Sequence, residues 1–150
     1  MGTHRGECAP SWRAACGWSL AELMVVLAIV GILSALAIPN YQQQQRKVRR
    51  GDARAALQQL QFDQTRYRGQ HARFAGTPAE LGWSRELSPQ GHYKLQLTEV
   101  SADGYVAEAI PLGAQAADQA CNPMRMVWRD VATVVYSSGP SQSSDPGQCW

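Results

Sequence analysis

The chain has 150 residues, which is enough for one compact domain and a membrane segment but not for two independent globular units. Its formal net charge of +2 is too small to indicate a nucleic-acid partner by itself. Hydrophobic residues make up 45% of the chain but are concentrated near its start, and no internal repeat or low-complexity tract appears.

An apolar stretch at residues 18–38 follows a polar leader at residues 1–17. About 20 apolar residues cross the hydrocarbon core of a bilayer, so the stretch predicts a membrane helix. Its one charged residue is Glu22, and a charge at that depth costs roughly 2.5–3.5 kcal/mol on insertion scales. Cleavage after Gly17 would place a new amino terminus on Trp18, one helical turn from Glu22. The ammonium and the carboxylate would then neutralise each other in lipid.

One long helix is predicted from Trp18 to about Arg68. Its first part is apolar all round, and its second part, residues 39–69, is amphipathic. One face of the second part follows the three-and-four spacing of a helix through Ala53, Leu57, Leu60, Gln64 and Tyr67. Gly31 and Pro39 weaken the regular pattern, and proline removes a backbone donor. We therefore expect a kink or a local opening of the helix near Ala35 to Pro39.

Short segments of alternating polarity follow a loop at residues 70–91. They predict strands at residues 93–98, 105–110, 124–129 and 132–136. Asp103-Gly104 predicts a turn that makes the first two strands a hairpin. An antiparallel sheet against the amphipathic part of the helix would bury both apolar faces, which predicts an α+β fold. The number and order of the strands stay open, because the segment after residue 124 is long and apolar.

The segment from Gly17 to Tyr41 resembles the class III signal of type IV pilins. The cleavage glycine, the glutamate, the helix glycine and the proline all occur in register, at Gly17, Glu22, Gly31 and Pro39. The resemblance implies cleavage after Gly17 by a prepilin peptidase, N-methylation of Trp18, and assembly into a filament through the helix. Three later segments, Ala109-Ile110-Pro111, Ala120-Cys121 and Cys149-Trp150, resemble the PilE-like minor pilins in particular.

The resemblance implies a pilin fold in three parts: a cleaved leader at 1–17, a helix at 18–69 and a globular domain at 70–150. The implied partners are other pilins, the prepilin peptidase, the assembly platform in the inner membrane and, before assembly, membrane lipid. The implied location is the inner membrane, with the globular domain in the periplasm, followed by the extracellular filament. The implied end use is pilus-dependent twitching motility or adhesion.

Two cysteines, Cys121 and Cys149, lie in the region that we expect outside the membrane, where disulfides persist. A bond between them would close a loop of about 28 residues and stabilise the domain by roughly 3–4 kcal/mol in the chain-entropy model. A zinc site is the alternative, but no second pair of ligands completes one. We therefore predict a disulfide, and no metal or other cofactor.

A basic cluster follows the apolar stretch and consists of Arg46, Lys47, Arg49, Arg50 and Arg54. Contact with phospholipid headgroups, at about 1 kcal/mol per charge, and a solvated helix face are equally good interpretations. DNA binding would need an exposed groove or interleaved aromatic residues, and the sequence supports neither. The cluster places more positive charge after the membrane segment than before it, which by itself favours the opposite orientation. The cleavage motif decides the orientation, because the peptidase must meet Gly17 on the cytoplasmic side.

The sequence contains no catalytic pattern: its histidines are scattered, and no nucleophile elbow or phosphate-binding loop occurs. We therefore predict a structural minor pilin rather than an enzyme, with Glu22 pairing with the terminal ammonium of a neighbouring subunit. The alternative for Glu22 is an inert residue of the anchor. The alternatives for the protein are a type II secretion pseudopilin and a non-polymerising inner-membrane protein that binds DNA or another ligand.

Overall fold

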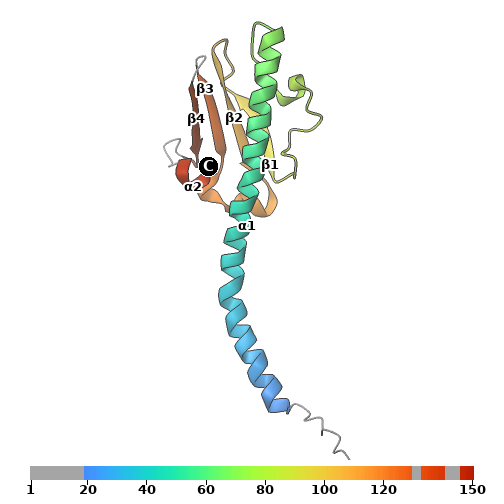
Figure 1. The fold of residues 1–150 in the computed structure, drawn as a ribbon, viewed down its shortest axis with the longest axis vertical. Coiled ribbons are helices and arrows are strands. Elements are labelled where there is room, and N and C mark those ends of the chain that lie inside the picture. Colours follow the sequence, from blue (N-terminus) through green and yellow to red (C-terminus); the bar gives the residue numbers. More distant parts are fainter. Residues whose placement is uncertain (1–18, 130–132, 141–145) are drawn as a thin grey trace, which may run out of the picture. The chain divides into compact units, whose positions relative to one another are not determined.

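The computed structural model describes residues 19–129, 133–140 and 146–150. The predicted leader and its cleavage residues, Gly17 and Trp18, lie outside the described residues. The elements follow in the order α1 (Leu20–Gln70), η1 (Pro78–Leu81), β1 (Tyr93–Thr98), β2 (Gly104–Pro111), η2 (Gly113–Ala117), η3 (Gln119–Cys121), β3 (Met124–Arg129), β4 (Thr133–Ser138) and α2 (Pro146–Cys149) (Figure 1). The chain divides into two compact units, Met1–Pro39 and Asn40–Trp150.

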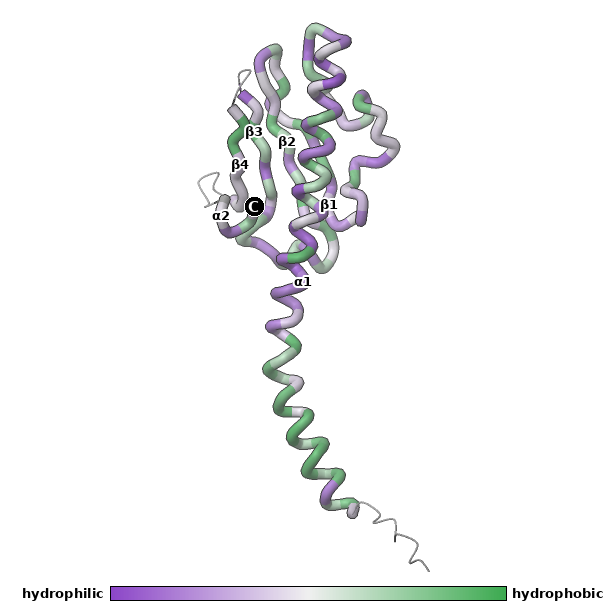
Figure 2. Tube along the Cα trace, viewed as in Figure 1, coloured by the Kyte–Doolittle hydropathy of each residue, from purple (hydrophilic) through white to green (hydrophobic). Residues whose placement is uncertain are grey.

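The first described residues explain where α1 begins. Ser19 is the N-cap: its Oγ accepts a hydrogen bond from the backbone N–H of Glu22 at 3.2 Å, and its carbonyl accepts one from Leu23. Apart from Glu22, the side chains that follow Leu20 are mostly apolar, and none of the apolar window is buried (Figure 2). This part of α1 is long and apolar enough to cross a membrane.

The helix continues without a break through Gly31 and Pro39. Proline supplies no N–H to the helical ladder, so one backbone hydrogen bond is missing at that turn. A local opening at these two residues on entry into a filament remains a prediction.

The four strands form one antiparallel sheet in the order β1-β2-β3-β4, so that each strand pairs with the next along the chain. The predicted strands at 93–98 and 124–129 are confirmed at both ends. β2 begins one residue before the predicted strand and ends one residue after it, and the fourth strand ends at Ser138 instead of residue 136. The order that the sequence left open is therefore a simple meander.

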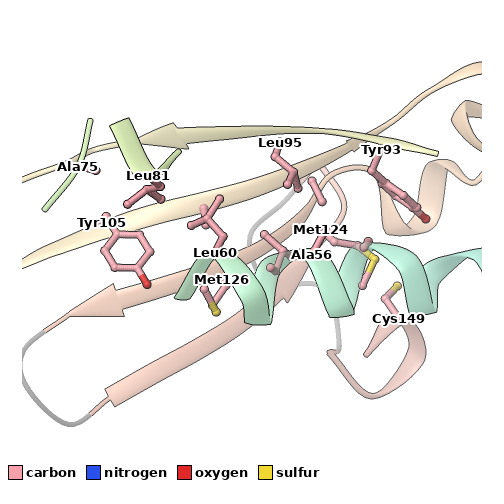
Figure 3. Packing of buried hydrophobic residues seen from close by; sticks show 14 of the residues in the cluster. Ala56, Leu60, Ala75, Leu81, Tyr93, Leu95, Tyr105, Met124, Met126 and Cys149 are labelled. Carbon is pink, nitrogen blue, oxygen red and sulfur yellow. The ribbon is translucent and has the colours of Figure 1, made fainter. Parts of the chain in front are cut away.

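The second part of α1 packs against one face of this sheet. Its buried residues are Asp52, Ala53, Ala56, Leu57, Leu60 and Gln64. They share a core with the inward residues of the strands, among them Leu95, Tyr105, Met124 and Met126 (Figure 3). The predicted helical face is confirmed, since Leu57 and Leu60 are fully buried and Tyr67 is partly buried. The α+β architecture is therefore confirmed as well.

Replacing Leu60 by alanine tests this packing. Leu60 is 0% exposed in the helix–sheet core, so Leu60→Ala should lower the free energy of unfolding by about 2–5 kcal/mol through lost burial and a residual cavity. Phe62 is 63% exposed on the same helix, and Phe62→Ala should change it by less than about 0.5 kcal/mol. Denaturant unfolding of the full chain in detergent, followed by circular dichroism, measures both. Equal unfolding midpoints for the two variants would contradict the packing described here.

Candidate functional site

Glu22 lies in the first turn of α1 and is exposed. It is the only charged residue of the sequence between residues 19 and 39. Ser19 and Glu22 also have the spacing of a capping box, in which the serine side chain caps the helix. The sequence analysis missed this local role, although the Ser-x-x-Glu pattern signals it. Glu22 therefore has a structural position at the helix start, and its carboxylate has no ion-pair partner among the described residues.

The base of the globular unit is closed by a disulfide. Cys121 and Cys149 are joined with an S–S distance of 2.04 Å and a Cα–Cα distance of 5.7 Å, which confirms the predicted pair. Both cysteines are buried. The bond links the end of η3 to α2, so the segment that includes β3 and β4 begins and ends at the same place.

Arg50 connects α1 to both sides of this disulfide. Its Nε and Nη2 donate to the two carboxylate oxygens of Asp118 at 2.7 and 2.8 Å. Its Nη1 donates to the backbone carbonyl of Gln148 at 2.7 Å. The side chains of Arg50 and Asp118 are only 12% and 8% exposed. This corrects the sequence interpretation that left Arg50 in a cluster available to lipid or solvent, because all three nitrogens of its guanidinium donate hydrogen bonds within the chain.

A buried glutamine fixes η2 on the same side of the helix. Gln115 is 1% exposed, and its Nε2 lies within hydrogen-bond distance of the backbone carbonyl of Arg46, the Tyr93 hydroxyl and Asp118. Burial raises the pKa of Tyr93 to about 12. Tyr93 thus contributes stability that is fully present below about pH 10 and is lost between about pH 10 and 12. Nothing in the local sequence pattern distinguishes Gln115.

A second buried polar residue of α1 fixes the loop that leads into β1. Asp52 is 4% exposed and accepts hydrogen bonds from the Ser88 hydroxyl and from the backbone N–H groups of Gln90 and His92. The Ser88 hydroxyl in turn accepts from the backbone N–H of Tyr93. Every partner of this carboxylate lies more than 30 residues away, so no sequence periodicity points to it.

Within the described part of the chain, no group of three or more His, Cys, Asp or Glu side chains could hold a metal ion.

Comparison with known proteins adds two family matches. The family model described as "Prokaryotic N-terminal methylation motif" matches residues 12–38. The model described as "Type IV minor pilin ComP, DNA uptake sequence receptor" matches residues 39–125, which is more than half of the chain.

Similar individual proteins are pilins and fimbrial proteins. The chain is 31% identical over 105 residues to the "Type IV major pilin protein PilA" of Myxococcus xanthus, covering 70% of this chain and 47% of that protein. It is 32% identical over 77 residues to a "Fimbrial protein" of Neisseria meningitidis serogroup B, covering 51% and 45%. A "Fimbrial protein" of Pseudomonas aeruginosa is 60% identical over 30 residues, 20% of each chain. The chain spans about half the length of the first two relatives.

An apolar helix that continues into an amphipathic half packed on an antiparallel sheet defines the class as pilin-like. With both matches considered, the chain belongs to the type IV pilin family, and the model that matches most of its globular part is that of the ComP minor pilins. The resemblance noted in the sequence is confirmed.

The ion pair at the base of the globular unit gives a stability prediction. Arg50→Gln leaves Asp118 nearly buried without its countercharge, so the free energy of unfolding should fall by about 3 kcal/mol. The neighbouring Arg49 has no ion-pair partner among the described residues, and Arg49→Gln should change it by less than about 0.5 kcal/mol. Thermal unfolding of both variants under non-reducing conditions provides the comparison. A midpoint for Arg50→Gln equal to that of wild type would show that the pair does not stabilise the fold.

Proposed function

We propose that this chain is a minor pilin, a structural subunit that is incorporated into type IV pili. In this proposal the leader is removed after Gly17, the new terminus at Trp18 is N-methylated, and the apolar part of α1 holds the chain in the inner membrane until assembly. The match to the methylation motif over residues 12–38 supports these steps, because it includes both residues and Glu22.

The observation on which the proposal rests is the uncovered apolar part of α1 with one carboxylate in its first turn. A helix that is apolar all round needs lipid or other helices around it. In the bilayer lipid covers it, and in a filament the equivalent helices of neighbouring subunits do so. This exchange would keep the apolar surface away from water throughout assembly.

Glu22 gives the exchange its direction in this proposal. A carboxylate in lipid is costly unless a cation neutralises it. The terminal ammonium of a neighbouring subunit would provide that cation once the leader has been removed. Subunits that assemble would therefore be favoured over subunits that stay isolated in lipid.

Gly31 and Pro39 would allow α1 to adapt during this step. Glycine costs about 1 kcal/mol and proline about 3 kcal/mol relative to alanine within a helix. The segment between them would be the part of α1 that opens on entry into the filament. The globular unit, closed by the disulfide, would then lie on the filament surface for twitching motility or adhesion.

Two substitutions of Glu22 separate charge from side-chain shape. Glu22→Gln keeps the length and helix propensity but removes the charge, whereas Glu22→Asp keeps the charge at a shorter reach. We expect Glu22→Gln to be recovered in sheared filaments at less than a tenth of the wild-type level, and Glu22→Asp at an intermediate level. Immunoblots of sheared filaments and of membranes measure this ratio.

The same samples report processing. Intact-mass and amino-terminal analysis should find that wild type and both variants lack residues 1–17, and that Trp18 of the filament form is methylated. Recovery of Glu22→Gln in filaments at the wild-type level would refute the role of the charge. An unprocessed chain as the working form in cells would refute the proposal as a whole.

DNA binding is the second candidate function, since the family model that matches residues 39–125 is described as a DNA uptake sequence receptor. The sequence did not indicate aromatic residues next to basic ones, but the structure has such residues near the end of α1. The rings of Tyr67 and His71 stack at 4.0 Å between centroids, and both line a small cavity together with Arg66 and the carboxylates of Asp63 and Glu80. Arg66 and Arg85 are exposed and have no ion-pair partner within the described chain. The phosphates of DNA are the expected ligands of these two arginines.

Gel-shift titration of the full chain in detergent with double-stranded DNA tests this candidate. Arg66→Gln combined with Arg85→Gln should weaken binding and reduce the slope of log affinity against log salt by up to about 0.9 for each phosphate contact that is lost. Arg46→Gln combined with Arg49→Gln is the charge-matched control, because both residues lie on an earlier part of α1. Absence of any DNA binding at low salt would eliminate this candidate and leave the filament role untouched.

A further inference from the structure

A cavity lies between η2 and the part of α1 that follows Pro39. The cavity has a volume of about 430 Å³. Residues of α1 and η2 line it, principally Tyr41, Gln45, Arg46, Arg49, Ala114 and Ala117. Gln45 Nε2 donates to the Tyr41 hydroxyl at 2.7 Å, so these two side chains form one connected wall.

The lining has two positive charges and no negative one. Arg46 and Arg49 are the charged residues that line the cavity, and neither has an ion-pair partner in the described ranges. The carboxylates nearest along α1 and η2 are already engaged. Asp118 is bound by Arg50, and Asp52 accepts hydrogen bonds from the loop before β1. The cavity therefore has an excess of positive charge that no described residue neutralises.

Contacts behind the cavity hold its wall in place. Gln115 lies between the lining residues Ala114 and Ala117, and its buried amide donates to the backbone carbonyl of Arg46. This hydrogen bond fixes η2 against α1 at the level of the arginines. The two alanines are small, so they leave open the space that larger side chains would fill.

The cavity lies just beyond the headgroup layer of a membrane along α1. Arg46 follows Ile38 by eight residues and Arg49 follows it by eleven, which is about 12 and 17 Å of helix. Helical side chains point towards the amino terminus, here back towards the apolar part, and a long arginine side chain extends that reach. The headgroup region is roughly 5–7 Å thick on each side of the hydrocarbon core, and tyrosine is enriched there, as at Tyr41.

We propose that this cavity binds the phosphate of an anionic phospholipid headgroup while the chain is stored in the membrane, with Arg46 and Arg49 contacting the phosphate oxygens. The proposal uses the membrane anchoring of the proposed function but not its filament step. A headgroup is favoured over DNA because the cavity is small, concave and close along the helix to the apolar part. Paired arginines suit a phosphate, since each guanidinium can donate two hydrogen bonds to its oxygens.

Native mass spectrometry of the full chain in detergent tests the proposal. The chain is titrated with phosphatidylglycerol and, separately, with phosphatidylcholine that has the same acyl chains. Wild type should bind phosphatidylglycerol more tightly. Arg46→Gln combined with Arg49→Gln should lower that affinity by about five-fold per charge removed, or about 30-fold in total. Arg66→Gln combined with Arg85→Gln removes the same charge elsewhere and should leave the affinity unchanged.

Competition arms identify the source of the phosphate. Glycerol phosphate and inorganic phosphate at millimolar concentration should displace little of the bound lipid. Complete displacement by either would assign the cavity to a free phosphate and overturn the lipid proposal. Loss of DNA binding in Arg46→Gln with Arg49→Gln, without any preference between the two lipids, would assign the cavity to DNA and overturn it as well.

The remaining outcomes are also decisive. Equal affinity of wild type for both lipids contradicts the proposal without reference to any variant, so a folding defect cannot obscure the result. Glu22→Gln should keep the preference for phosphatidylglycerol, because Glu22 is far from the cavity along α1. A preference that survives in this variant while filament recovery is lost would support the lipid site and the charge requirement independently.

Discussion

The side chains of α1 face two different surroundings, and the rest of the structure depends on how the sequence changes between them. Up to Pro39 every face of α1 needs an apolar environment, because none of its apolar window is buried among the described residues. Beyond Asn40 only one face is covered, and the sheet covers it through Leu57 and Leu60. The globular unit therefore exists because four strands supply an apolar face that half of one helix requires. In the proposed function, lipid or other copies of the chain would cover the other half.

Polar contacts decide how the loops of the globular unit attach to α1. Arg50, Asp52 and Gln64 lie on or beside the buried face, and each binds a different segment: the disulfide region, the loop before β1, and the backbone of Ala75. A buried polar group without a partner costs free energy. Each of these residues therefore favours the loop conformation that supplies its hydrogen-bond partner over conformations that do not. The apolar core holds the sheet on the helix, whereas these three residues determine which loop lies where. The open cavity beside η2 is a product of the same arrangement, because Gln115 fixes the wall that leaves the two arginines without a countercharge.

The elements with local patterns could be predicted, and the long-range polar contacts could not. The strands at 93–98 and 124–129 follow from strict alternation, and the buried face through Ala53, Leu57 and Leu60 follows from helical spacing. The disulfide followed from two cysteines in an oxidising compartment. In contrast, Arg50 was grouped with its basic neighbours because its partner Asp118 is 68 residues away. The contacts of Asp52 and Gln115 could not be predicted for the same reason, since the local pattern around a single polar residue does not indicate its distant hydrogen-bond partner.

The position of Arg50 has a consequence for the chemistry of the disulfide. Its guanidinium binds Asp118, three residues before Cys121, and Gln148, one residue before Cys149. After reduction these hydrogen bonds would still hold both segments on α1, so the two thiols would remain neighbours at a high effective concentration. Reoxidation would then regenerate the same pair instead of exchanging with thiols of other chains. The Arg50 side chain would in this way help to preserve the disulfide connectivity of the carboxyl-terminal region.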